Sequence, residues 1–180
     1  MFIGTMTKTD NRKALEEGFV KAKQIVYEHI TSILIKMCDD LIDDALAEKE
    51  YGNFTGNTVT SYACGLFISG RLSYVSLSSD KLDGPIRIKL AKGESAYLDP
   101  DYDGGARAIK GTVETDGKYG YQTSLDFLNF YNSNSKGFEI VMCTGTEYSS
   151  YIEEEIGANV LTDTFINSKQ ILLSNLKPMN

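Results

Sequence analysis

The stretch that decides the fold runs from residue 11 to residue 47 and reads NRKALEEGFVKAKQIVYEHITSILIKMCDDLIDDALA. Apolar residues recur in it every three or four positions, the spacing of one face of an α-helix. This stripe consists of Leu15, Phe19, Ala22, Val26, Ile30, Ile33, Met37, Leu41 and Ala45. Neither Gly nor Pro interrupts the segment after residue 19. We therefore expect one continuous helix over residues 11–47, preceded by an N-terminal arm of residues 1–10.

The expected helix is too long for a domain of this size. At a rise of 1.5 Å per residue it would extend roughly 55 Å, more than the width of a compact domain of this chain length. Part of it must therefore lie against something else, either a sheet of its own chain or a neighbouring subunit. This is the first indication of assembly.

The rest of the chain shows shorter patterns of strands and helices. Strands are predicted over residues 72–77, 85–90, 111–114 and 138–142, the last as a central strand, and helices over 125–131, 147–156 and 162–176. Residues 58–66 are expected to be helical or irregular, and residues 97–108 to be a loop. This order predicts a single α+β domain of 180 residues, with an antiparallel sheet against the N- and C-terminal helices.

Composition and charge narrow the classes of function. A hydrophobic fraction of 42% and a charged fraction of 24% are typical of a folded, soluble protein. The net charge of −7 disfavours tight binding to nucleic acid, because the phosphate backbone is negative as well. Three widely spaced cysteines favour a reducing compartment, and no apolar run approaches the ~18 residues of a membrane span.

The acidic sequence DDLIDD, residues 39–44, is the sharpest local motif. It places Asp39, Asp40, Asp43 and Asp44 within two turns of the helix, with the carboxylates expected on one face. Isoprenoid synthases use such a motif to hold magnesium and diphosphate, but a second acidic helix is needed and none is visible. The alternatives are a solvated face and an acidic docking face for a basic patch on a neighbouring subunit.

The remaining candidates for chemistry are incomplete. Residues 99–104 copy the opening of a calcium loop, but Lys110 occupies the twelfth position, where a bidentate Glu closes such a site. His29 is the only histidine, which leaves no triad or histidine metal site to build. We therefore predict no catalytic residue, no cofactor and no metal, and a chain that is not an enzyme.

Two segments resemble the tail-completion, or neck, proteins of tailed bacteriophages. They are NFTGNTVTS, residues 53–61, and CTGTEYSSYIE, residues 143–153. Members of that family open with a long helix, continue with a Thr-Gly-Asn turn, a short helix and strands, and later show a strand that ends in Gly-Thr before Tyr-x-x-Tyr-aliphatic-Glu. The same parts occur here in the same order, and relative to the family residues 81–136 look like an insertion.

The resemblance implies a virion protein that assembles in the cytoplasm of the bacterial host. Copies would form a ring between portal and tail, bind portal or neck proteins and tail proteins, and let the genome pass without specific binding. The family motifs imply roles for Thr55 as a cap, Gly56 in a tight turn and Glu153 as a partner for a neighbouring subunit. The full set of interface candidates is Asp39, Asp40, Asp43, Asp44, Thr55, Gly56, Asn57, Leu125, Phe127, Leu128, Tyr131, Tyr148, Tyr151, Ile152 and Glu153.

Two alternatives stay open. Within the same class, the chain would be a tail-terminator or minor capsid subunit. From another class, it would be a soluble module that binds carbohydrate or calcium through residues 97–131.

Overall fold

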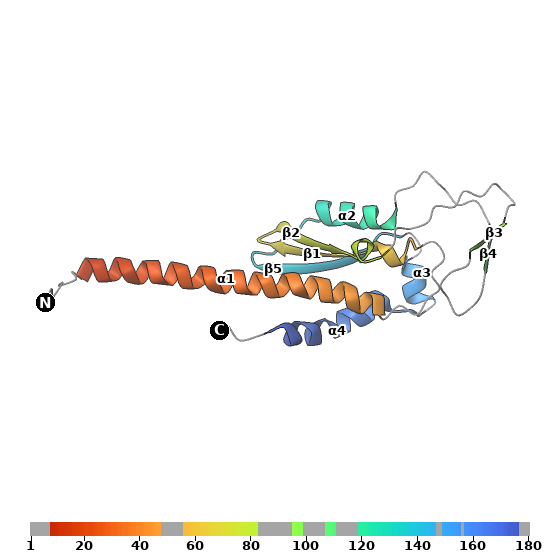
Figure 1. Ribbon diagram of the computed structural model, residues 1–180. Coiled ribbons are helices and arrows are strands. Elements are labelled where there is room, and N and C mark those ends of the chain that lie inside the picture. Colours follow the sequence, from red (N-terminus) through yellow and green to blue (C-terminus); the bar gives the residue numbers. More distant parts are fainter. Residues whose placement is uncertain are drawn as a thin grey trace.

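The computed structural model describes residues 8–47, 56–82, 95–98, 107–110, 119–146, 149–155 and 157–176. Its dominant element is the helix α1, Lys8–Ala47, which runs unbroken for 40 residues (Figure 1). The long helix predicted from the apolar stripe is therefore confirmed. It begins three residues earlier than expected, so residues 8–10 belong to the helix and not to an N-terminal arm.

Within the described residues, three strands form an antiparallel sheet in the order β2-β1-β5. They are β1, Tyr62–Ile68, β2, Arg71–Leu77, and β5, Phe138–Thr144. Gly65 in the middle of β1 lies opposite Val75 of β2 and Val141 of β5. The predicted strands over 72–77 and 138–142 are confirmed, but β5 lies at an edge of this sheet, and the central strand is β1.

The central strand β1 was missed, and residues 58–66 were wrongly expected to be helical or irregular. Only Val59–Ser61 form a short 3-10 helix, η1, and the strand YACGLFI follows directly. This run does not alternate between apolar and polar residues because both of its faces are covered. Leu66 packs in a cluster with α1, whereas Phe67 packs on the opposite face against Leu128.

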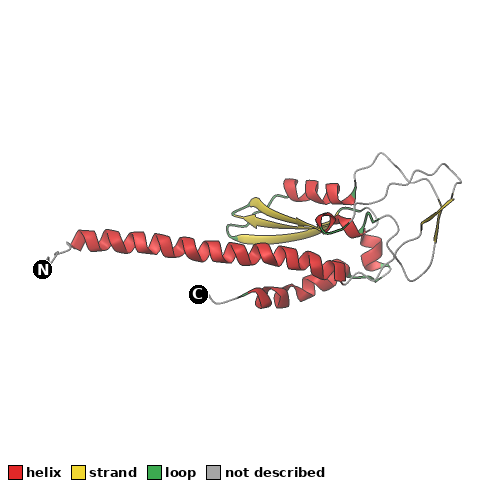
Figure 2. Ribbon diagram, viewed as in Figure 1, coloured by secondary structure: helices red, strands yellow, loops and turns green. Residues whose placement is uncertain are grey.

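Three shorter helices complete the described body: α2, Gly120–Phe130, α3, Ser149–Glu154, and α4, Val160–Asn175. They create a layered arrangement of α2, the sheet, α1 and α4 (Figure 2). α2 begins five residues before the predicted helix and lies within residues 81–136, so part of the expected insertion packs on the sheet. The architecture is the predicted α+β fold.

The expected loop over residues 97–108 is wrong at its two ends. β3, Ser95–Leu98, and β4, Arg107–Lys110, form a separate antiparallel ladder, preceded in the chain by the 3-10 helix η2, Ser78–Asp80. The strands predicted over 85–90 and 111–114 fall outside the described residues. Among the described helices, none combines the length and the apolar character needed to cross a membrane.

Candidate functional site

Asp39 and Asp43 of the acidic motif face the sheet side of α1. Tyr74 of β2 donates its hydroxyl hydrogen to Asp39 Oδ1 at 2.9 Å, and Ser76 Oγ donates to the same oxygen at 2.6 Å. Lys81, directly after η2, forms an ion pair of 2.6 Å with Asp43 and donates to the Asp39 carbonyl at 3.0 Å. Asp39 and Asp43 thus connect α1 with β2 and with the segment that follows it.

Asp40 and Asp44 face α4. Asn175 Nδ2 donates to Asp40 Oδ2 at 2.6 Å, and Asn167 Nδ2 donates to Asp44 Oδ2 at 3.2 Å. Lys36, one turn earlier on α1, adds an ion pair of 2.6 Å to Asp40. The four carboxylates therefore lie on two flanks of α1, and the prediction that they share one face is wrong. Consecutive helical residues point about 100° apart, so neighbours in the pairs Asp39-Asp40 and Asp43-Asp44 meet different elements.

These contacts shift two protonation equilibria. Burial and then the hydrogen bond to Asp39 raise the pKa of Tyr74 to about 12. Burial raises the pKa of Asp40, but the hydrogen bonds from Lys36 and Asn175 outweigh it and leave the pKa below its ordinary value. Both shifts favour the protonation states that make the tertiary contacts, so the motif acts in holding α1, β2 and α4 together.

The two segments that resemble the neck family meet at the beginning of α2. Gly56 adopts φ +77°, as expected for the tight turn, and its carbonyl accepts a hydrogen bond from the Thr60 amide at 3.0 Å. Asn57 Oδ1 accepts a hydrogen bond from the Gly120 amide at 2.8 Å, and so caps a helix 63 residues further along the chain. Thr55, the other residue of the turn, lies outside the described residues.

The second segment joins the same junction through its strand end. The hydroxyls of Ser61 and Thr144 lie 2.6 Å apart, and Ser124 Oγ of α2 donates to the Ser61 carbonyl at 2.5 Å. A Cβ on Gly145 would lie 2.2 Å from the Gly120 carbonyl oxygen, so only glycine fits between this turn and α2. No local sequence pattern marks Gly120 and Ser124 as parts of this junction, because their partners lie far away in the chain.

Glu153 also has its partner within the chain. Its Oε1 accepts a hydrogen bond from the Leu161 amide at 2.9 Å in the first turn of α4, where the helix dipole favours a carboxylate. The geometry thus gives it a capping contact within its own chain, and its pairing with a neighbouring subunit stays a prediction. The other candidates of this segment, Tyr148, Tyr151 and Ile152, have side chains outside the described part of the chain.

The apolar candidates on and after α2 divide between core and surface. Leu128 is fully buried under the sheet, and the Tyr131 ring packs on Phe67 with 5.3 Å between centroids, so these two belong to the fold. Leu125 is half-buried and Phe127 is exposed. The most exposed aromatic side chain of α2 is Phe130, at 86%, which sequence reasoning did not select.

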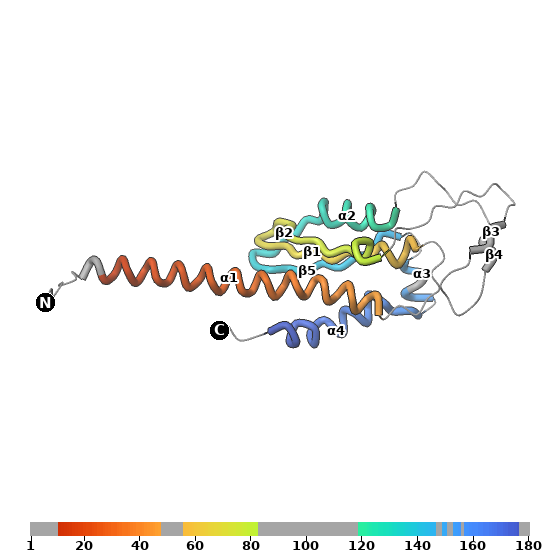
Figure 3. The backbone as a smooth tube through the Cα atoms, viewed as in Figure 1, coloured from red at the N-terminus to blue at the C-terminus, as the bar shows by residue number. Residues whose placement is uncertain are grey.

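The largest open apolar surface lies on the first half of α1. We call residues 11–26 the α1 extension; every one of its residues is exposed, and it projects beyond the sheet (Figure 3). Phe19 is 60% exposed. The large apolar residues of the extension, all exposed, are Leu15, Phe19, Val20, Ile25 and Val26.

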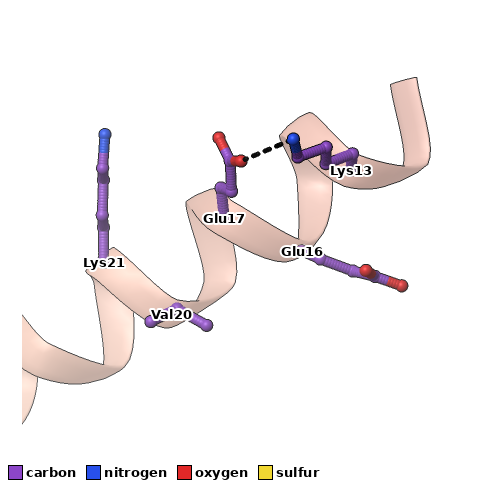
Figure 4. A pocket seen from close by; sticks show the side chains of 5 residues that line it. All are labelled: Lys13, Glu16, Glu17, Val20 and Lys21. Carbon is purple, nitrogen blue, oxygen red and sulfur yellow. Dashed lines mark ion pairs between the residues drawn. The ribbon is translucent and has the colours of Figure 1, made fainter. Parts of the chain in front are cut away.

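A hollow on the extension does not form a binding pocket. It is lined by Lys13, Glu16, Glu17, Val20 and Lys21, which all come from two turns of one helix (Figure 4). Lys13 and Glu17 form an exposed ion pair of 4.0 Å across it. Because all these side chains point outward from a single helix, they do not converge on a ligand.

A second open apolar surface lies on α4. Phe165 is 79% exposed, and Ile166, Leu173 and Leu176 are also exposed. Spacings of seven, eight and eleven residues place these side chains on one side of the helix. We call this surface the α4 outer face.

The thiols of Cys64 and Cys143 are held in their protonated form. The hydrogen bond with Cys38, and then burial, raise the pKa of Cys64, and burial raises the pKa of Cys143 to about 11. The described residues contain no group of three or more side chains suited to hold a metal ion. The calcium-like segment at residues 99–104 lies outside the residues that the structure describes.

Comparison with protein-family models, with curated proteins and with solved structures finds no match for this chain.

Proposed function

We propose that this chain is a structural subunit of a tailed bacteriophage, a neck or tail-completion protein that assembles into a ring between portal and tail. One observation carries the assembly part of this proposal. The α1 extension exposes large apolar side chains along an entire helix half, and no described residue of the same chain covers them. Exposed apolar surfaces of this extent mark sites of protein association.

The phage assignment is supported by the two family-like segments. Residues 56–61 and 144–146 lie on opposite sides of α2 in the sequence, yet both contact its first turns. A junction of this kind fixes the end of the sheet relative to α2, which suits a rigid building block of a larger assembly. The resemblance supplies the identity of that assembly.

The net negative charge of the chain suits a channel through which DNA moves. The chain carries a net charge of −7, and affinity for DNA comes from neutralising phosphates with basic side chains. An acidic channel wall neutralises few phosphates, so few counterions are released and the wall binds the DNA duplex weakly. The genome would pass such a ring without specific binding.

The proposal is tested by the mass and shape of the protein in solution, alone and with portal or tail proteins. We expect closed rings in electron micrographs, either at high concentration or on portal complexes, and no retardation of DNA at physiological salt. Binding to the end of the tail tube without binding to portal would favour a tail terminator. A protein that stays monomeric and binds neither component would overturn the proposal.

A further inference from the structure

The apolar side chains of the α1 extension continue an interface that already exists within the chain. Helix α4 packs antiparallel along one side of α1, since Asn167 contacts Asp44 and Asn175 contacts Asp40. Steps of three or four residues lead along that side from Asp40 back to Ile33 and on to the extension. There it continues uncovered through Val26, Phe19 and Leu15.

The α4 outer face is the second open surface. Phe165, Ile166 and Leu173 point away from α1, since the residues of α4 that contact α1 lie on its other side. Each molecule thus has one uncovered apolar helix face on its extension and another on its body.

We propose that the α1 extension of one copy lies on the α4 outer face of the next copy. This arrangement rests on the proposed function and deepens it, because a head-to-tail contact between two different surfaces is what closes subunits into a ring. Each copy then donates one extension and receives one, so both open surfaces are covered in every subunit.

The two surfaces match in size. The exposed apolar side chains of the extension run from Leu15 to Val26 and those of the α4 outer face from Phe165 to Leu176, so each surface spans about 17 Å along its segment. Packed side by side, the two helices with their polar neighbours would bury on the order of 1,000 Å² in total, the lower limit for a specific interface.

The charges of the two partners have complementary signs. The extension, residues 11–26, carries four basic and two acidic side chains, whereas residues 149–176, which include α3 and α4, carry four acidic side chains and one basic side chain. Glu154 and Glu155 are exposed shortly before α4 begins. Salt is expected to weaken the contact moderately, because these charges are exposed and screened.

An antiparallel pairing of two extensions is the competing geometry. It would cover Phe19 and its neighbours but leave the α4 outer face, with Phe165 at 79% exposure, in water. The two geometries make opposite predictions when variants are mixed, which provides the test.

The experiment uses two double variants of the full chain. The first, Phe19→Asp with Val26→Asp, damages the extension, and the second, Phe165→Asp with Leu173→Asp, damages the α4 outer face. All four side chains are exposed, so both variants should keep the circular dichroism and melting temperature of the parent monomer. Gln24→Asp and Ser174→Asp serve as controls, because each adds one exposed negative charge on another side of the helix concerned.

Self-association is measured by sedimentation across protein concentration. Each double variant alone should associate at least about 100-fold more weakly than the parent, because a carboxylate loses its hydration at an apolar contact. Mixed one to one, the two variants should recover a heterodimer, in which the intact extension of one binds the intact α4 outer face of the other. The control variants should associate as the parent does.

The inference is overturned if the α4 variant alone associates like the parent, if mixing restores nothing, or if the parent stays monomeric even on portal complexes. Rings that survive both double variants would leave the proposed function standing and remove only this contact. A restored heterodimer without any binding to portal or tail proteins would support this contact and overturn the proposed function.

Discussion

The two halves of α1 have the same apolar spacing and opposite environments. From Met37 to Ala45 the apolar side chains are buried between the sheet and α4, and the carboxylates among them accept hydrogen bonds from β2 and α4. Along the α1 extension the same apolar spacing meets no covering element among the described residues, and the charged side chains pair with each other along the helix. The same apolar spacing thus packs in the core in one half of α1 and forms an exposed surface in the other half.

The largest expected effect comes from truncating an apolar side chain in each half. Ile42→Ala should lower the free energy of unfolding by about 3 kcal/mol, because Ile42 is fully buried and its removal leaves a cavity. Phe19→Ala should change it by less than about 0.5 kcal/mol. Urea unfolding at low protein concentration measures both. A cost for Phe19→Ala close to that for Ile42→Ala would show that the extension packs on its own chain.

Removing a carboxylate should also lower the free energy of unfolding more in the buried half of α1 than in the extension. Asp39→Ala should cost about 2 kcal/mol, because it leaves the hydroxyls of Tyr74 and Ser76 without their acceptor. Glu16→Ala removes an exposed ion pair with Arg12 and should cost less than about 0.5 kcal/mol. The same urea titrations report both values, and equal costs would contradict the division between the two halves.

Alkaline pH should weaken the contact between α1 and β2. The pKa of Tyr74 is about 12 in the folded protein and about 10 in the unfolded chain, so its contribution is complete below pH 10 and is lost as the pH rises toward 12. Tyr74→Phe should therefore lose less stability than the parent between pH 10 and pH 12. The difference between the two proteins cancels the titration of the other tyrosines and the lysines. Parallel curves of stability against pH for the variant and the parent would contradict the contact between Tyr74 and Asp39.

The smallest effect is expected within the extension itself. A Cβ at Gly18 would meet nothing within 4 Å, so Gly18→Ala should favour the helix locally by up to about 1 kcal/mol. Hydrogen exchange of the amides at residues 11–26 should slow up to about fivefold in the monomer, while the global unfolding free energy stays unchanged. Slowing at residues 37–45 as well would mean that the two halves open as one unit.

The sequence predicted those elements whose residues alternate between two environments. α1 and α4 show helical periodicity, and β2 alternates Ser with apolar residues, because each has one face toward the core. β1 was missed because both of its faces are buried, which removes the alternation. A continuous apolar run of this length fits a buried strand or a buried helix equally well.

The candidate site was less predictable because its partners lie far apart along the chain. At the start of α2, the Gly120 amide donates to Asn57, 63 residues earlier, and no local pattern in the sequence predicts this contact. In the acidic motif the residue types were recognised, but only the positions of β2 and α4 decide which flank each carboxylate faces.

The unbroken course of α1 through both halves also has a mechanical consequence. A helix without Gly or Pro between Phe19 and Ala47 bends little, so a load on the extension is carried directly to the buried base. Residue 11 lies about 42 Å from Asp39 along the helix, so a tilt of roughly 10° at the buried base becomes a displacement of about 7 Å at the tip of the extension. The hydrogen bonds of Asp39 to Tyr74 and of Asp40 to Asn175 hold the base of this lever. A force on the extension would therefore strain these two contacts first.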